Sequence, residues 1–156
     1  MAGITPTRFE TTGEMLLVGL RKHYTFGGEA GIEKQWWDFV PKMESIPDRV
    51  PDVTYGVCLD FNLSEGFDYL SAVEVTKVSE TIPGMDVLRL PARRYAVFTH
   101  EGHYSTLPQT FEAIIREWVP TVTNTDNTAP NFERYNRDFC PETGIGGIEI
   151  WFPLTD

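Results

Sequence analysis

Four short motifs in the first half of this chain recur, in the same order, in the second half. The matched pairs are His23-Tyr24-Thr25 with His103-Tyr104-Ser105, Val40-Pro41 with Val119-Pro120, Asp60-Phe61 with Asp138-Phe139, and Val73-Glu74-Val75 with Ile148-Glu149-Ile150. The spacing between partners falls from 80 to 75 positions along the chain, as small loop deletions would produce. One such match carries little weight, but four in order indicate an internal duplication.

Each half is expected to contain the same elements in the same order, strand-helix-strand-strand. In the first half, these are strands at residues 14–25, 53–61 and 67–78 and a helix at 31–43 that ends near Val40, because Pro41 interrupts the helical spacing. In the second half, they are an extended stretch at 85–100 with a bend at Pro91-Ala92, a helix at 105–119 with Ser105 as its N-cap, and strands at 132–139 and 148–154.

This order predicts a single α+β domain over residues 1–156, with repeat one at about 9–78 and repeat two at about 85–154. The duplication implies pseudo-two-fold symmetry, with antiparallel sheets backed by two helices. Pockets commonly form at interfaces between domains or repeats. We therefore expect a ligand cleft between the two repeats.

Charge and composition restrict the function. The net charge is −10 and the pI is about 4.7. A chain this acidic is repelled by phosphate backbones, so direct nucleic-acid binding is not expected, although a cationic ligand or a protein partner is compatible with it. Aromatic residues make up 13% of the chain, and flat rings commonly line small-molecule pockets.

The sequence lacks the usual signals for targeting, metals and cofactors. The sequence contains neither an apolar signal core nor an apolar run long enough to cross a membrane. We therefore expect a cytoplasmic protein that does not contact a membrane. Cys58 and Cys140 lack zinc spacing and are expected as free thiols. His100 and His103 are one residue too close for the HExxH motif, which argues against a metal site. With no Gly-rich phosphate loop either, we expect no cofactor.

Several ordered motifs resemble one known family. The second half contains LPARRYAVFTHEGHYSTLPQTFEAIIREWVP, then NFERYNRDF and IEIWFPL, and the first half contains QWWDFVP and VTYGVCLDF. Together these resemble the GyrI-like, or effector-binding, domains from about Phe9 to Leu154. Many such proteins carry a DNA-binding helix-turn-helix region before this domain. About eight residues precede the region of resemblance here, so we expect a stand-alone binding domain.

The resemblance implies a pocket with a buried carboxylate at Glu133, in the "Phe-Glu-x-Tyr" strand. Tyr135 is expected on the same strand face, because side chains alternate with a period of two. In drug-sensing relatives this Glu attracts lipophilic cations, to which aromatic rings add cation–π attraction.

The repeat suggests further ligand-binding residues. An offset of 78 makes Tyr55 the counterpart of Glu133, which predicts a ring on one side of the pocket and a carboxylate on the other. Tyr69 and Trp151, on the last strand of each repeat, are candidates to complete an aromatic cage. Trp37 is a candidate roof, whereas its neighbour Trp36 follows the apolar stripe and is expected in the core.

Three functions remain open. The first is binding of hydrophobic, planar or cationic xenobiotics. The second is hydrolysis of cyclopropane-containing, DNA-alkylating natural products, with Glu133 and Tyr135 as catalytic residues and Tyr55 and Trp37 holding the substrate. The third is inhibition of a protein partner, as in the gyrase-inhibiting relatives. The oligomeric state is not predicted.

Overall fold

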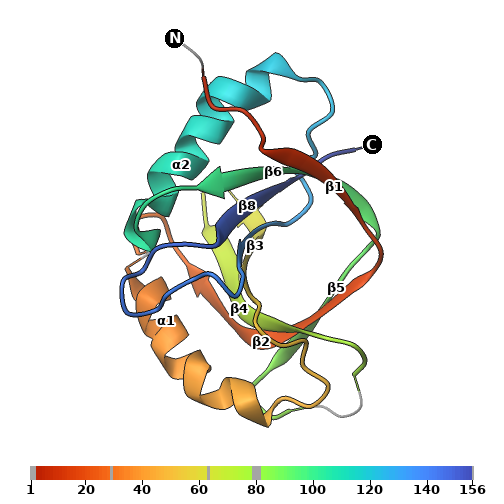
Figure 1. Cartoon of the computed structure of the whole chain (residues 1–156), viewed down its shortest axis with the longest axis vertical. Coiled ribbons are helices and arrows are strands. Elements are labelled where there is room, and N and C mark those ends of the chain that lie inside the picture. Colours follow the sequence, from red (N-terminus) through yellow and green to blue (C-terminus); the bar gives the residue numbers. More distant parts are fainter. Residues whose placement is uncertain (1–2, 29, 63, 79–81, 156) are drawn as a thin grey trace.

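The computed structural model describes residues 3–28, 30–62, 64–78 and 82–155. Within these residues, eight strands form one antiparallel sheet in the order β1-β6-β8-β7-β3-β4-β2-β5. They are β1 (Arg8–Thr12), β2 (Met15–Tyr24), β3 (Thr54–Asn62), β4 (Gly66–Val75), β5 (Asp86–Leu90), β6 (Arg93–His100), β7 (Asn131–Tyr135) and β8 (Ile148–Pro153). Two helices, α1 (Gly31–Phe39) and α2 (Leu107–Ala113), lie on one side of the sheet (Figure 1), which confirms the α+β class.

The topology repeats as the sequence motifs do. The elements β2, α1, β3 and β4 recur as β6, α2, β7 and β8, and the two units join through β3 and β7 into one continuous sheet. Gly56 pairs with Glu133 at the middle of the β3–β7 ladder. These two residues therefore lie at the junction of the repeats.

A further strand precedes each unit and pairs with the first strand of the other unit. β1 pairs with β6, and β5 pairs with β2, so each repeat completes its neighbour's side of the sheet. The sequence analysis did not anticipate β1. Its five residues, RFETT, form a short edge strand that is never fully buried, and such a strand carries little hydrophobic pattern.

Short links force the sheet to curl. Only Gly13-Glu14 joins β1 to β2, although these strands lie near opposite ends of the strand order, and only Pro91-Ala92 joins β5 to β6. Two linking residues span at most roughly 11 Å. The sheet therefore bends into a half-barrel whose ends, β1 and β5, close toward each other (Figure 1).

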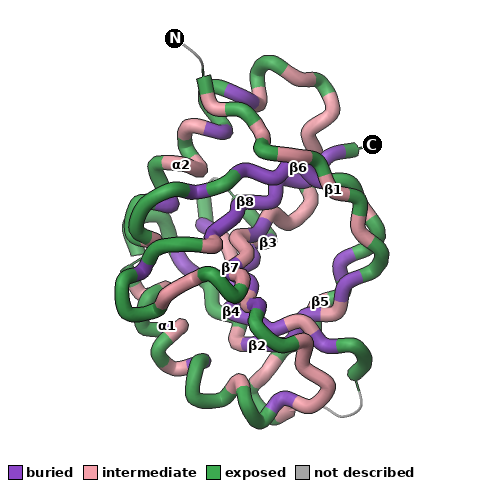
Figure 2. The backbone as a smooth tube through the Cα atoms, in the orientation of Figure 1, coloured by how far each residue is buried: buried purple, intermediate pink, exposed green. Residues whose placement is uncertain are grey.

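The curl creates an inner and an outer face with separate cores. The outer face packs against α1 and α2, with Phe39 against Val73 near α1 and Trp118 against Phe98 near α2. The inner face is lined by side chains from the strands, such as Val57, together with Val50 and Val53 from the segment before β3. Buried segments accordingly follow the central strands in Figure 2.

The second helical segment differs from the sequence expectation. It begins as a 3-10 turn (Tyr104–Thr106), continues as α2, and ends in a π turn (Ile114–Trp118) and a 3-10 turn (Val119–Thr121). His103 caps its first turn, because its Nδ1 accepts a hydrogen bond from the backbone N–H of Ser105 at 3.1 Å. The predicted cap at Ser105 is therefore wrong. Among the described helices, none is long and apolar enough to cross a membrane.

The end of the first helix agrees with the sequence prediction, whereas the end of β7 does not. The first helix does end at Phe39, next to Val40, and a 3-10 turn (Val40–Ser45) follows. β7, however, stops at Tyr135 instead of continuing to residue 139. Asn136 turns the chain there: its Oδ1 accepts from the backbone N–H of Asp138 at 2.9 Å, an arrangement that competes with the strand ladder.

Candidate functional site

Glu133 projects from the middle of β7 toward the outer, helix-covered face. Its partner across the ladder is Gly56, which has no side chain. A Cβ at Gly56 would lie 2.0 Å from the hydroxyl oxygen of Tyr69 and 2.6 Å from Oε1 of Glu133. The glycine therefore leaves the space in which these two polar groups meet.

Two tyrosines hold one oxygen of this carboxylate. The hydroxyl of Tyr69 donates to Oε1 of Glu133 at 2.5 Å, and that of Tyr135 donates to the same oxygen at 2.9 Å. Oε2 accepts no hydrogen bond from the part of the chain that the structure describes. Within that same part, no Lys, Arg or His nitrogen lies within 4.0 Å of the carboxylate. The group is thus oriented but has no counter-charge.

The surroundings of Glu133 are aromatic and largely apolar. Trp36, from α1, donates its Nε1–H to the hydroxyl of Tyr69 at 3.0 Å, and its ring meets that of Tyr135 at 5.7 Å. Phe139 packs against the other side of Tyr135 at 5.0 Å. Burial raises the pKa of Glu133 above its usual range, and the hydrogen bonds from Tyr69 and Tyr135 partly oppose this shift.

Helix α1 is attached to the sheet beside this cluster. Gln35 is fully buried, and its Nε2 donates to the backbone carbonyls of Leu20 at 2.8 Å and Tyr69 at 3.0 Å. Tyr24 donates to Oε1 of Gln35 at 2.5 Å. These bonds fix the helix at the position that brings Trp36 over the carboxylate.

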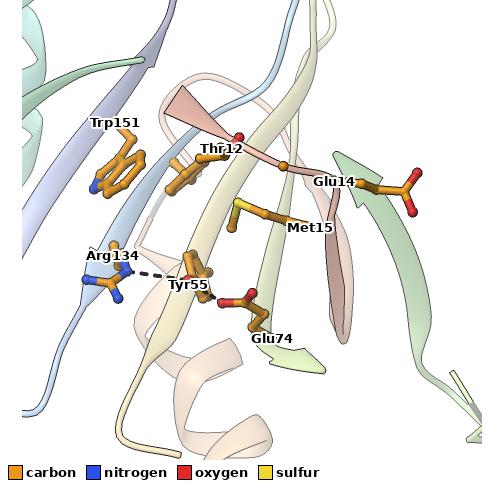
Figure 3. Close-up of a pocket in the computed structure, with 9 residues that line it drawn as sticks. Thr12, Glu14, Met15, Tyr55, Glu74, Arg134 and Trp151 are labelled. Carbon is orange, nitrogen blue, oxygen red and sulfur yellow. Dashed lines mark hydrogen bonds between the residues drawn. The ribbon is translucent and has the colours of Figure 1, made fainter. Parts of the chain in front are cut away.

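The structure separates the six predicted ligand-binding residues into two faces. Glu133, Tyr69 and Tyr135 meet on the outer face. Tyr55 pairs with Arg134 and therefore points to the inner face, where Trp151 also lies (Figure 3). The offset of 78 that made Tyr55 the counterpart of Glu133 is consequently off by one residue.

The remaining predicted residue is exposed. Trp37 has 70% of its surface accessible to solvent, while the adjacent Trp36 packs over Tyr69 and Tyr135. Trp36 and Gly56 are site residues that the sequence analysis did not assign. Trp36 was recognised as part of the buried stripe of its helix, and that stripe faces the carboxylate.

Comparison with known proteins identifies the family of this chain. The model of the GyrI-like small molecule binding domain matches residues 5–155, nearly the whole chain. This chain belongs to the GyrI-like family. The resemblance found in its motifs is thereby confirmed, and the chain is a small-molecule binding domain.

A curated relative of this GyrI-like domain is longer than the chain itself. The transcriptional regulator BrlR of Pseudomonas aeruginosa is 31% identical over 133 residues, which cover 83% of this chain and 49% of BrlR. The chain thus spans about half the length of this regulator.

Two solved structures share the fold. SAV2435 bound to tetraphenylphosphonium superposes with a TM-score of 0.77 and 22% identity, over 94% of this chain and 92% of that one. A transcription regulation protein of Staphylococcus aureus MU50 superposes with a TM-score of 0.72 and 21% identity, over 96% and 97% of the two chains.

Proposed function

We propose that this GyrI-like domain binds lipophilic cations with aromatic bodies, including xenobiotics, at the Glu133 carboxylate on the outer face. The observation that carries the proposal is a carboxylate held among aromatic rings, with no basic side chain within 4.0 Å among the residues that the structure describes. An unpaired charge in such surroundings is costly, so a ligand that neutralises it without needing water gains affinity there. SAV2435, which shares the fold, is bound to a cation of this type.

The hydrogen bonding leaves one carboxylate oxygen for the ligand. Tyr69 and Tyr135 both occupy Oε1, so Oε2 is the atom that would face the positive charge. The rings of Trp36 and Tyr135 would then supply cation–π and stacking contacts. Because Trp36 is hydrogen-bonded to the Tyr69 hydroxyl and packs on Tyr135, a bulky guest that reaches Glu133 has to turn this indole away from the hydroxyl of Tyr69.

The test uses two probes of the same shape and opposite charge, tetraphenylphosphonium and tetraphenylborate, titrated calorimetrically. We expect the cation to bind at least about tenfold more tightly than the anion, and we expect Glu133→Gln to remove this preference. Glu74→Gln is the matched control, since it removes a carboxylate from the inner face. Equal binding of both probes, or equal loss in the two variants, would contradict the proposal.

The affinity for the cation should also depend on pH. Because burial raises the pKa of Glu133, protonation competes with cation binding over a range above the usual pKa of a glutamate. The affinity of the wild type should rise with pH and then level off, whereas Glu133→Gln should show no such rise.

A second candidate function, hydrolysis of a strained cyclopropane, also uses Glu133. A carboxylate with a raised pKa and a free Oε2 is suited to take a proton from an attacking water. Incubation with a cyclopropane-containing alkylating natural product, followed by mass spectrometry, tests this candidate. A hydrated product that forms with the wild type and not with Glu133→Gln would establish turnover.

A further inference from the structure

The inner face of the half-barrel holds a pocket of its own, of about 280 Å³ (Figure 3). Its walls include Met15, Tyr55, Glu74, Phe132, Arg134 and Trp151. Strand alternation separates it from the proposed cation site, because Arg134 and Glu133 are neighbours on β7 that point to opposite faces. The sheet itself therefore stands between the two sites.

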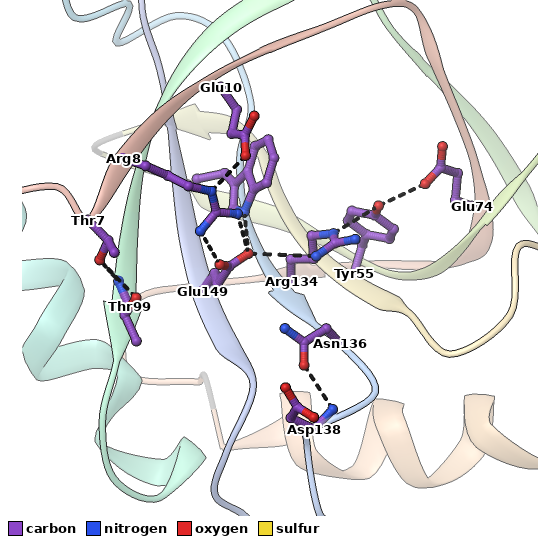
Figure 4. Close-up of polar contacts among 11 residues, drawn as sticks. Thr7, Arg8, Glu10, Tyr55, Glu74, Thr99, Arg134, Asn136, Asp138 and Glu149 are labelled. Atoms are coloured by element: carbon purple, nitrogen blue, oxygen red, sulfur yellow. Dashed lines mark hydrogen bonds and ion pairs between the residues drawn. The ribbon is translucent and has the colours of Figure 1, made fainter.

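The positive charge beside this pocket is already balanced. Nη1 of Arg134 lies 3.6 Å from Oε1 of Glu149, and its Nε donates to the hydroxyl of Tyr55 at 3.3 Å. Glu149 is further paired with Arg8 through two contacts, at 2.6 and 3.2 Å. Figure 4 shows this chain of contacts continuing from Arg8 through Glu149, Arg134 and Tyr55 to Glu74.

The negative charge at the other end of the chain of contacts is not balanced. The carboxylate of Glu74 accepts a hydrogen bond from the Tyr55 hydroxyl at 2.8 Å. No basic side chain comes within 4.0 Å of it in residues 3–28, 30–62, 64–78 and 82–155. Burial raises the pKa of Tyr55, so this hydroxyl stays protonated and donates to Glu74 instead of neutralising it.

The apolar walls favour a flat guest. Phe132 and Trp151 stack with their ring centroids 5.4 Å apart, and Tyr55 meets Phe132 edge to face at 5.5 Å. Met15 adds a polarizable, adaptable side chain to this wall. A ring can rest against these side chains, while a carboxylate guest would meet an arginine that Glu149 already occupies.

We propose that the inner pocket is a second ligand site, which takes a small aromatic amine in its protonated form. The ammonium group pairs with Glu74, and the ring packs against Met15, Phe132 and Trp151. The volume suits a guest of one or two rings, smaller than the bulky cations proposed for the outer face. The two sites are independent, so this proposal does not rest on Glu133.

The experiment uses three probes that share the indole ring and differ in charge: tryptamine, the neutral tryptophol and the anionic indole-3-propionate. Each is added to protein labelled with ¹⁵N, and the side-chain indole N–H signals are followed by NMR. Trp151 lines the inner pocket, whereas Trp36 contacts the outer cluster, so the signal that moves reports which face is occupied.

We expect tryptamine to shift the Trp151 signal and to bind at least about tenfold more tightly than tryptophol, with indole-3-propionate weakest. Glu74→Gln, whose amide oxygen still accepts from Tyr55, should reduce the advantage of tryptamine to about threefold or less. Glu133→Gln is the matched control and should leave the tryptamine shift of the Trp151 signal unchanged, because Glu133 does not line the inner pocket.

Four results would overturn the proposal. These are tighter binding of indole-3-propionate than of tryptamine, a tryptamine shift at Trp36 without one at Trp151, loss of the Trp151 shift in Glu133→Gln, and absence of binding by all three probes. If Glu74→Gln does not fold, the ranking of the probes and the Trp151 signal in the wild type decide the question.

Discussion

The hydroxyl of Tyr69 connects helix α1 to the half-buried carboxylate of Glu133, and its removal tests the whole cluster. It donates to Oε1 of Glu133 at 2.5 Å and accepts from Nε1 of Trp36 at 3.0 Å, and Tyr69 is almost completely buried. In Tyr69→Phe, the carboxylate keeps only the bond from Tyr135, and the Trp36 N–H loses its acceptor. Both groups are half-buried, so water compensates each loss only in part.

The expected cost follows from these two bonds. A hydrogen bond to a charged group contributes about 1.5–3 kcal/mol, and leaving a buried donor unsatisfied costs about 1–3 kcal/mol. Tyr135 still donates a hydrogen bond to Oε1, and the Trp36 side chain can reorient in part. We therefore expect Tyr69→Phe to lower the free energy of unfolding by about 2–4 kcal/mol. For a domain of this size, that corresponds to a Tm lower by roughly 4–16 °C.

The measurement is urea unfolding followed by circular dichroism at about pH 8, where carboxylates are normally ionised. Tyr95→Phe is the matched control: Tyr95 is equally buried, and its hydroxyl lies near Arg93 without making a hydrogen bond of normal geometry. That variant should not lower the free energy of unfolding, because it removes a buried hydroxyl that makes no hydrogen bond of normal geometry.

A double-mutant cycle with Glu133→Gln isolates the bond to the carboxylate. A neutral amide is a weaker acceptor than a carboxylate, so the cost of Tyr69→Phe should be smaller by about 1 kcal/mol in the Gln background. The reasoning fails if Tyr69→Phe costs no more than the Tyr95 control, or if its cost is the same in both backgrounds.

Three further predictions concern stability. The pKa of Glu133 is raised in the folded state, so its contribution to stability is fully present below the unfolded pKa of about 4.5 and is lost as pH rises through the folded pKa. Glu133→Gln should therefore have a higher Tm than the wild type at neutral pH. A higher Tm for the wild type at neutral pH would contradict this. Gly56→Ala places a Cβ 2.0 Å from the Tyr69 hydroxyl and should cost about 1–3 kcal/mol in urea unfolding, a cost that should shrink when combined with Tyr69→Phe. The pKa of Glu149 is lowered, in part by hydrogen bonding to Arg8, so its contribution to stability is present above the unfolded pKa of about 4.5 and is lost as pH falls through the folded pKa. Glu149→Gln should therefore flatten the acid side of a plot of Tm against pH. An unchanged slope would count against a stabilising ion pair between Glu149 and Arg8.

The sequence by itself determined the architecture of the repeat and the composition of one strand. Recurring motifs predicted the duplication, and hydrophobic periodicity located seven of the eight strands and both helices. The alternation of side chains placed Glu133 and Tyr135 on one face, and the hydrogen bond between them agrees with this. These features depend on local order along the chain, and local order is what a sequence displays.

Only the tertiary structure decided which residues meet across strands. The loops of the two repeats differ in length, so motif spacing aligns the halves only to within a few residues, and a shift of one residue moves a side chain to the opposite face. For this reason Tyr55 was matched to Glu133, although pairing places Gly56 opposite the carboxylate and Tyr55 on the inner face.

The same limit applies to the edges of the sheet and to the helix that covers the site. β1 becomes a strand because β6 offers it a partner from the other repeat, which its own five residues do not reveal. Trp36 rather than Trp37 covers Glu133, because the bonds of Gln35 to the sheet set the rotation of α1. The inner pocket exists because two-residue links curl the sheet, and that closure is a property of the whole chain.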